Sequence, residues 1–146
     1  MTTHHLRTDL LYDPAALFWL DVRGNIARIG MSPLVQESTG SFVAVQLAAA
    51  GATVAKGESF GSTEAEKHVG QLKAPVSGKL LRCNERVQET PRLINTDPYD
   101  EGWLVEIDMT NAAAELPQLV QGEAEVKLFF EIEIKKYQDK GWLAEK

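Results

Sequence analysis

The sequence predicts a single, mainly β domain of the α+β class, with short helices between and after its strands. Three observations lead to this prediction. Apolar residues alternate with polar ones in short stretches along the first two thirds of the chain, and turn residues separate these stretches. The length of 146 residues suits one domain. The last third contains apolar spacings that fit a helix.

The elements follow in order along the chain. We expect a flexible N-terminus over residues 1–11 and one domain over residues 12–146. A turn or short helix begins at Asp13-Pro14, because proline is tolerated at the first helical position. Another short helix opens at Ser32-Pro33, with Ser32 as its cap, and runs to about Ser38. The alternation predicts strands over Phe18–Val22, Ile26–Met31, Phe42–Leu47, Ser59–Ala65, Val69–Pro75, Lys79–Cys83 and Trp103–Met109.

The C-terminal segment from about residue 111 is predicted to be helical. Asn111–Gln121 fits a helix that Pro117 interrupts, whereas the preceding Glu89–Gly102 is turn-rich. The stretch Val126–Tyr137 allows two interpretations, since its apolar residues alternate as in a strand and also fall on one helical face. Gly122, just before an acidic turn, is a suitable helix start, and we therefore choose the helix.

Composition excludes several classes of function. The formal net charge of −6 argues against a nucleic-acid surface. No apolar run approaches the roughly 20 residues of a membrane span, and the N-terminus has no secretory signal, so we expect no membrane partner. The single cysteine, Cys83, suits a reducing cytoplasm, and we expect it to be a small buried thiol. No catalytic triad, P-loop or spaced metal-ligand cluster is present, so we expect neither an active site nor a metal.

Lys67 is the candidate functional residue. The strands Ser59–Ala65 and Val69–Pro75 leave Glu66-Lys67-His68 as the turn of a hairpin, with the lysine amine in solvent. Lys67 follows Glu64 by three residues and precedes Pro75 by eight. An enzyme that acylates one lysine among several needs such a protruding position. Lys73, on the returning strand, is the nearest rival but has the wrong spacing.

The sequence around Lys67 resembles the H protein of the glycine cleavage system, a lipoyl-carrying protein, from Tyr12 to about Met109. The strongest stretch, Ala74–Leu104, contains Pro75-Val76-Ser77-Gly78, Asn84-Glu85, Pro91, Leu93-Ile94-Asn95, Asp97-Pro98-Tyr99 and Glu101-Gly102-Trp103-Leu104. Biotinyl and acyltransferase lipoyl domains share the spacing from lysine to proline. The longer series of motifs between Ala74 and Leu104 is specific to H-type proteins.

The resemblance implies a fold, a cofactor and partners. The fold would be the lipoyl/biotinyl-type hammerhead β-sandwich, or barrel-sandwich hybrid, with C-terminal helices. Lipoic acid would be attached covalently to Lys67, and Glu64, together with Glu66 and His68, would be recognised by the lipoylating enzyme. The cofactor would perform the thiol–disulfide chemistry, so the chain would be a carrier rather than an enzyme. Expected partners are a lipoate ligase or lipoyl transferase, dihydrolipoamide dehydrogenase and the enzymes that load and unload the arm.

One departure from the family affects the expected cargo. A His-Glu pair usually precedes the tryptophan that corresponds to Trp19 and helps to line the arm cleft, and this chain has Leu17 and Phe18 there. We expect Leu17, Phe18 and Trp19 to line an apolar cleft that holds a cationic aminomethyl group poorly. This favours the divergent lipoate-binding proteins of heterodisulfide-reductase-like sulfur oxidation, and a heterodisulfide-reductase-like complex as partner, over glycine cleavage.

Two further alternatives remain open. A biotinyl carrier is disfavoured because biotinyl sites have methionine on both sides of the lysine, where this chain has Glu66 and His68. An unmodified interaction module would tolerate replacement of Lys67 by arginine, whereas a carrier would not.

Overall fold

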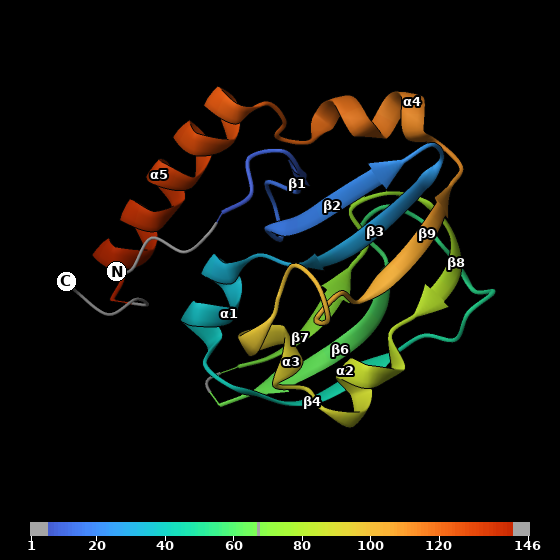
Figure 1. The fold of residues 1–146 in the computed structure, drawn as a ribbon, viewed down its shortest axis with the longest axis horizontal. Helices are drawn as coiled ribbons and strands as arrows, with labels where there is room; N and C mark the ends of the chain where they lie inside the picture. The colour runs from blue at the N-terminus through green and yellow to red at the C-terminus, as the bar shows by residue number, and fades with distance from the viewer. Residues whose placement is uncertain (1–5, 67, 142–146) are drawn as a thin grey trace.

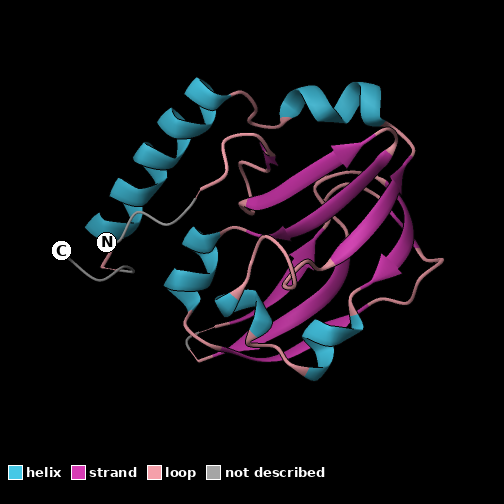
Figure 2. Ribbon diagram, in the orientation of Figure 1, coloured by secondary structure: helices cyan, strands magenta, loops and turns pink. Residues whose placement is uncertain are grey.

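The chain folds into two antiparallel sheets with helices along their edges (Figures 1 and 2). A computed structural model describes residues 6–66 and 68–141, and gives no side-chain account of Gln36 and Glu37. The larger sheet has the order β1-β2-β3-β9-β8-β5 and the smaller one β4-β6-β7. The strands are β1 Leu11–Tyr12, β2 Phe18–Arg23, β3 Ile26–Met31, β4 Phe42–Leu47, β5 Thr53–Val54, β6 Ser59–Ala65, β7 Val69–Lys73, β8 Gly78–Cys83 and β9 Val105–Met109.

The predicted mainly β class is confirmed, with helices that are short apart from the last one. They are α1 Pro33–Thr39, α2 Glu85–Glu89, α3 Leu93–Thr96, α4 Ala112–Glu115, the 3₁₀ turn η1 Leu116–Gln118 and α5 Glu123–Asp139. The helical interpretation of Val126–Tyr137 is confirmed, because this segment lies within α5. Figure 1 shows α5 at one end of the molecule, beside β1 and beyond α1.

Two apolar clusters stabilise this arrangement. The larger one contains inward-facing residues of both sheets, so it forms the core of a sandwich. Its fully buried members include Leu20, Ile29, Phe60, Leu80 and Ile107. The second cluster joins α5 to the end of the larger sheet, and contains Tyr12, Leu17, Trp19, Leu34, Val126 and Phe130. The ring of Phe130 meets that of Tyr12 edge-on, with centroids 4.8 Å apart.

Several predicted element boundaries were wrong. The segment Glu89–Gly102 was expected to be turn-rich, yet it contains α3 and the end of α2. Asn84 begins α2, since its side-chain oxygen accepts a hydrogen bond from the Arg86 backbone N–H over 3.1 Å. Strand β7 ends at Lys73 rather than Pro75, and β9 begins at Val105 rather than Trp103. The predicted helix around Pro117 is two short pieces, because Pro117 lies in the separate 3₁₀ turn.

Three smaller expectations also differ from the structure. Ser32 occupies the position before α1, but its side chain makes no capping hydrogen bond, and its hydroxyl is buried without a partner in the described part of the chain. Cys83 is half-buried rather than buried, and its thiol donates to the carbonyl of Ala48 over 2.8 Å. Desolvation raises the pKa of this thiol. Within the segment expected to be flexible, Leu10 is buried and Leu11 pairs with Leu20.

Candidate functional site: a hairpin tip beside an apolar cavity

The hairpin predicted to present Lys67 is formed by β6 and β7. Strand β6 has the predicted bounds, and Glu64 lies directly opposite Val69 in the antiparallel register. The Ala65 backbone N–H donates to the carbonyl of His68 over 2.8 Å, which closes a four-residue turn. The predicted attachment residue, Lys67, falls between Glu66 and His68 in the sequence and lies outside the described residues.

Glu66 fixes the turn to the segment between α1 and β4. Its backbone N–H donates to the carbonyl of Ser41 over 3.1 Å, and its carboxylate accepts from the Ser41 N–H over 2.8 Å. Asn95, on α3, holds the residues on either side of Ser41. Its side-chain oxygen accepts from the Phe42 N–H, and its amide donates to the carbonyl of Gly40, each over 2.9 Å. Glu66, at the start of the hairpin turn, therefore has a defined position relative to the rest of the fold.

Glu64 faces outward on the smaller sheet. It lies in a row across the three strands, with Ala44 on one side and Val69 on the other, and all three residues are exposed. The Val69 side chain is 70% exposed, and Val43, next to Ala44, is 58% exposed. The carboxylate of Glu64 makes no ion pair with any described residue. Glu64 thus lies on an exposed face, with aliphatic surface around it.

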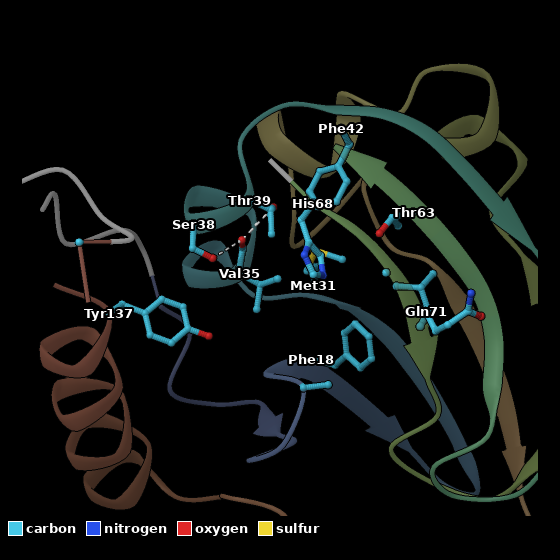
Figure 3. A pocket seen from close by; sticks show the side chains of 14 residues that line it. Phe18, Met31, Val35, Ser38, Thr39, Phe42, Thr63, His68, Gln71 and Tyr137 are labelled. Carbon is cyan, nitrogen blue, oxygen red and sulfur yellow. Dashed lines mark hydrogen bonds between the residues drawn. The ribbon is translucent and has the colours of Figure 1, made fainter. Parts of the chain in front are cut away.

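A cavity of about 690 Å³ opens beside the hairpin (Figure 3). Cavities of roughly 300–1,000 Å³ are typical of small-molecule sites. The apolar part of its lining is Ala16, Phe18, Met31, Val35, Phe42 and Leu72. Polar side chains reach it from three places: Ser38 and Thr39 on α1, Thr63, His68 and Gln71 around the hairpin, and Tyr137 on α5. None of the described lining side chains carries a carboxylate.

His68 is exposed and also lines this cavity. Figure 3 shows its imidazole among the labelled lining residues, between the hairpin and α1. The ring also covers Gly70, where an added Cβ would lie 2.9 Å from the imidazole Nε2. The three predicted recognition residues therefore differ in surroundings. Glu64 faces solvent, Glu66 binds the α1–β4 segment and His68 lines the cavity.

Of the three residues expected to line an arm cleft, Phe18 lines this cavity, whereas Leu17 and Trp19 do not contribute to its described lining. Successive residues of a strand face opposite sides of the sheet, so Phe18 and Trp19 cannot share a cavity. Trp19 is buried in the cluster beneath α5 and donates its indole N–H to the carbonyl of Pro98 over 2.9 Å. Leu17, with a φ of 61°, is buried in the same cluster.

Sequence reasoning missed several cavity residues. The sequence predicts Met31, Phe42 and Leu72 only as strand residues, because alternation indicates which residues share a face but not where a cavity opens. Tyr137 had one usable signal, since it shares a helical face with Val126 and Phe130. Burial raises the pKa of the Tyr137 phenol, as does the nearby carboxylate of Glu133.

Two properties of the described residues bear on other functions. Within residues 6–66 and 68–141, no group of three or more His, Cys, Asp or Glu side chains is arranged to hold a metal ion. In the same part of the chain, no helix combines the length and the apolar character needed to cross a membrane.

Comparisons with known proteins identify the family. The family model for the glycine cleavage H-protein matches residues 10–132. The chain belongs to this family. The H protein of Carboxydothermus hydrogenoformans is 42% identical over 113 residues, which cover 77% of this chain and 86% of that protein. The H protein of Corynebacterium jeikeium is 38% identical over 123 residues, which cover 82% of this chain and 93% of that protein.

A solved structure shows the same fold. The crystal structure of the glycine cleavage system H protein from Mycobacterium marinum matches with a TM-score of 0.72 and 31% identity. The match covers 84% of this chain and 98% of that one. The sandwich expected from the resemblance is therefore confirmed. Proteins of the glycine cleavage H-protein family are lipoyl carriers without catalytic activity of their own, and they hold lipoate covalently on a lysine.

The residues of the cavity fit this cofactor. A lipoyl arm consists of a hydrocarbon chain that ends in two sulfur atoms, so it is largely apolar. Phe18 and Phe42 offer aromatic rings and Met31 a polarisable thioether, and sulfur makes favourable contacts with aromatic rings. His68, next to Lys67 in the sequence, lines the same cavity. An arm attached at the hairpin would begin beside this lining.

Proposed function

We propose that this chain carries lipoate on Lys67 and acts as the H-type carrier of glycine cleavage. The observation that carries the proposal is the closed turn between Ala65 and His68, with Glu66 bound to Ser41. This turn supports the presentation of one lysine at a fixed place, next to an apolar cavity. The match to the glycine cleavage H-protein family supports the choice of cofactor and pathway.

The chain contributes position rather than chemistry. When bound, lipoate supplies a disulfide that accepts a nucleophilic group and a dithiol that can be reoxidised by thiol–disulfide exchange. The hairpin holds the attachment point, so a docked enzyme meets the arm at an effective concentration of roughly millimolar. The apolar walls around Phe18 and Phe42 exclude water from whatever part of the arm lies inside.

The proposed partners follow from the same function. A lipoate ligase or lipoyl transferase would attach the cofactor and recognise the exposed Glu64. The enzymes of glycine cleavage would load and unload the arm, and dihydrolipoamide dehydrogenase would reoxidise it. We propose a cytoplasmic location, since the free thiol of Cys83 suits a reducing compartment.

Heterodisulfide-reductase-like sulfur oxidation is the second candidate pathway. It is favoured by the absence of a carboxylate from the described cavity lining, because a cationic cargo would have no counter-charge there. The preference for sulfur oxidation depends also on Leu17. This residue is buried under α5 and does not contribute to the described cavity lining. The reported relatives and the solved structure are all named as glycine cleavage H proteins, so glycine cleavage is the better supported pathway.

Exchange of labelled bicarbonate into glycine tests the pathway. Lipoylated protein is mixed with the decarboxylating enzyme of glycine cleavage from the same host, and the Lys67→Arg variant serves as the matched control. The proposal predicts exchange with the wild-type protein and none with the variant. Absence of exchange with fully lipoylated protein would reject glycine cleavage, and heterodisulfide-reductase-like genes beside this gene would then favour sulfur oxidation.

A further inference from the structure

The cavity has one wall that lies outside the family match. The match ends at residue 132, whereas α5 continues to Asp139, and Tyr137 from this continuation lines the cavity. Figure 3 shows the Tyr137 ring facing the cavity from α5, on the side opposite the hairpin residues Thr63 and Gln71.

The orientation of Tyr137 is fixed by the anchored face of α5. Val126 and Phe130 are fully buried, and Tyr137 lies on the same helical face, at positions separated by four and then seven residues. Tyr137 is itself half-buried against the cluster around Phe130. The opposite face of the helix is in solvent, since Leu128 and Ile132 are 58% and 49% exposed. The helix therefore directs one ring toward the cavity and leaves the other face free.

We propose that Tyr137 closes the α5 side of the cavity over a lipoyl arm attached at Lys67, and so retains the arm inside when no enzyme is docked. The inference rests on the proposed function, because it needs the arm at Lys67. A phenol suits this position, since its ring covers apolar atoms and its hydroxyl reaches water or a polar partner. Removal of the ring opens that side without touching the hairpin or the sandwich core.

The test measures how well the arm is protected from solvent. Wild-type, Tyr137→Ala and Tyr137→Phe proteins are lipoylated, and intact mass first verifies loading, so a failure of the proposed function is detected separately. The arm is reduced and treated with a maleimide, and the labelling rate of the Lys67 peptide is followed by mass spectrometry. The matched control is Leu128→Ala, an exposed residue of the same helix. Cys83 is an internal reference, because it is half-buried and does not line the cavity.

The expected result is faster labelling of the arm in Tyr137→Ala by about threefold or more, as for a shift from a closed to an open population. Labelling of Cys83 should not change, and Tyr137→Phe and Leu128→Ala should behave as wild type. Equal arm labelling in all four proteins would overturn the proposal, and so would a parallel rise at Cys83, which indicates general loosening. As a second readout, lipoylation should shift the NMR signals of the Tyr137 ring, and unchanged signals would also overturn it.

Discussion

Asn95 and Glu66 hold the same short segment from two directions. Asn95 bonds the backbone of Gly40 and Phe42, and Glu66 bonds both backbone groups of Ser41 between them. The hairpin turn next to Lys67 is thereby connected to α3, although these elements are far apart in the sequence. Asn95 belongs to the motif that carries the family resemblance, and we expect it to have a mechanical role in positioning the site.

Replacement of Asn95 by alanine should loosen the hairpin as well as the fold. The change removes the partners of a backbone N–H and a carbonyl, which costs about 1–3 kcal/mol of unfolding free energy. The rate of enzymatic lipoylation should fall at a temperature where the variant is still folded. The matched control is Asn25→Ala, since Asn25 also bonds two groups, Asp108 and the Met109 carbonyl. Equal lipoylation rates in both variants would contradict the mechanical role.

Glu64 should govern attachment of the cofactor and leave stability unchanged. The exposed carboxylate has no ion pair within the described residues, so Glu64→Gln removes a charge without breaking an ion pair in that part of the chain. We expect a roughly tenfold slower initial rate of lipoylation by a lipoate ligase, as for the loss of one charged interaction with an enzyme. The melting temperatures of Glu64→Gln and wild type should agree. Glu125→Gln on α5 is the control, and a normal rate for Glu64→Gln would rule out recognition through this residue.

Gly30 should be intolerant of any side chain. Gly30 lies directly opposite Trp19, and an added Cβ would stand 2.6 Å from the indole Nε1. Overpacking of a buried site costs about 1–3 kcal/mol, so Gly30→Ala should lower the midpoint of urea unfolding markedly. The cost should be smaller in a Trp19→Phe background, because the smaller ring leaves room. Additive effects of the two substitutions would mean that the clash does not cause the loss.

Alkaline pH should destabilise the protein through a pair of tyrosines. The hydroxyls of Tyr12 and Tyr99 are 2.6 Å apart, and burial raises the pKa of both above the usual 10.0. The folded state keeps these phenols protonated. Their contribution to the free energy of unfolding is therefore present below pH 10 and is lost as the pH rises above that value. Unfolding free energy measured between pH 9 and 11 should therefore fall less steeply in Tyr99→Phe than in wild type. Parallel curves would exclude this pair as the cause.

The sequence predicted local features better than tertiary ones. Alternation predicted the bounds of β6 and the turn after Ala65, because a hairpin depends on neighbouring residues. The α2 helix was missed although Asn84-Glu85 is a recognisable start, since an asparagine caps and an acidic residue follows. Leu17 and Trp19 lie away from the described cavity lining for a tertiary reason. Both pack against α5, which lies more than 100 residues further along the chain.

The contribution of Tyr137 to the cavity could not have been predicted from the sequence. Helical periodicity places Tyr137 with Phe130, but only the packing of Phe130 on Tyr12 sets where α5 lies. The contribution of His68 was not predicted either, because the sequence places it at the hairpin turn but does not show that its ring lies over Gly70 and lines the cavity.

Intact-mass spectrometry of the protein from its native host, with peptide mapping across residues 59–79, tests the central claim most directly. The account predicts one lipoyl adduct on Lys67 and none on Lys56, Lys73 or Lys79, and loss of the adduct in Lys67→Arg but not in Lys73→Arg. An unmodified Lys67 in cells that lipoylate other proteins would contradict the account, and an unmodified interaction module would then be the better interpretation.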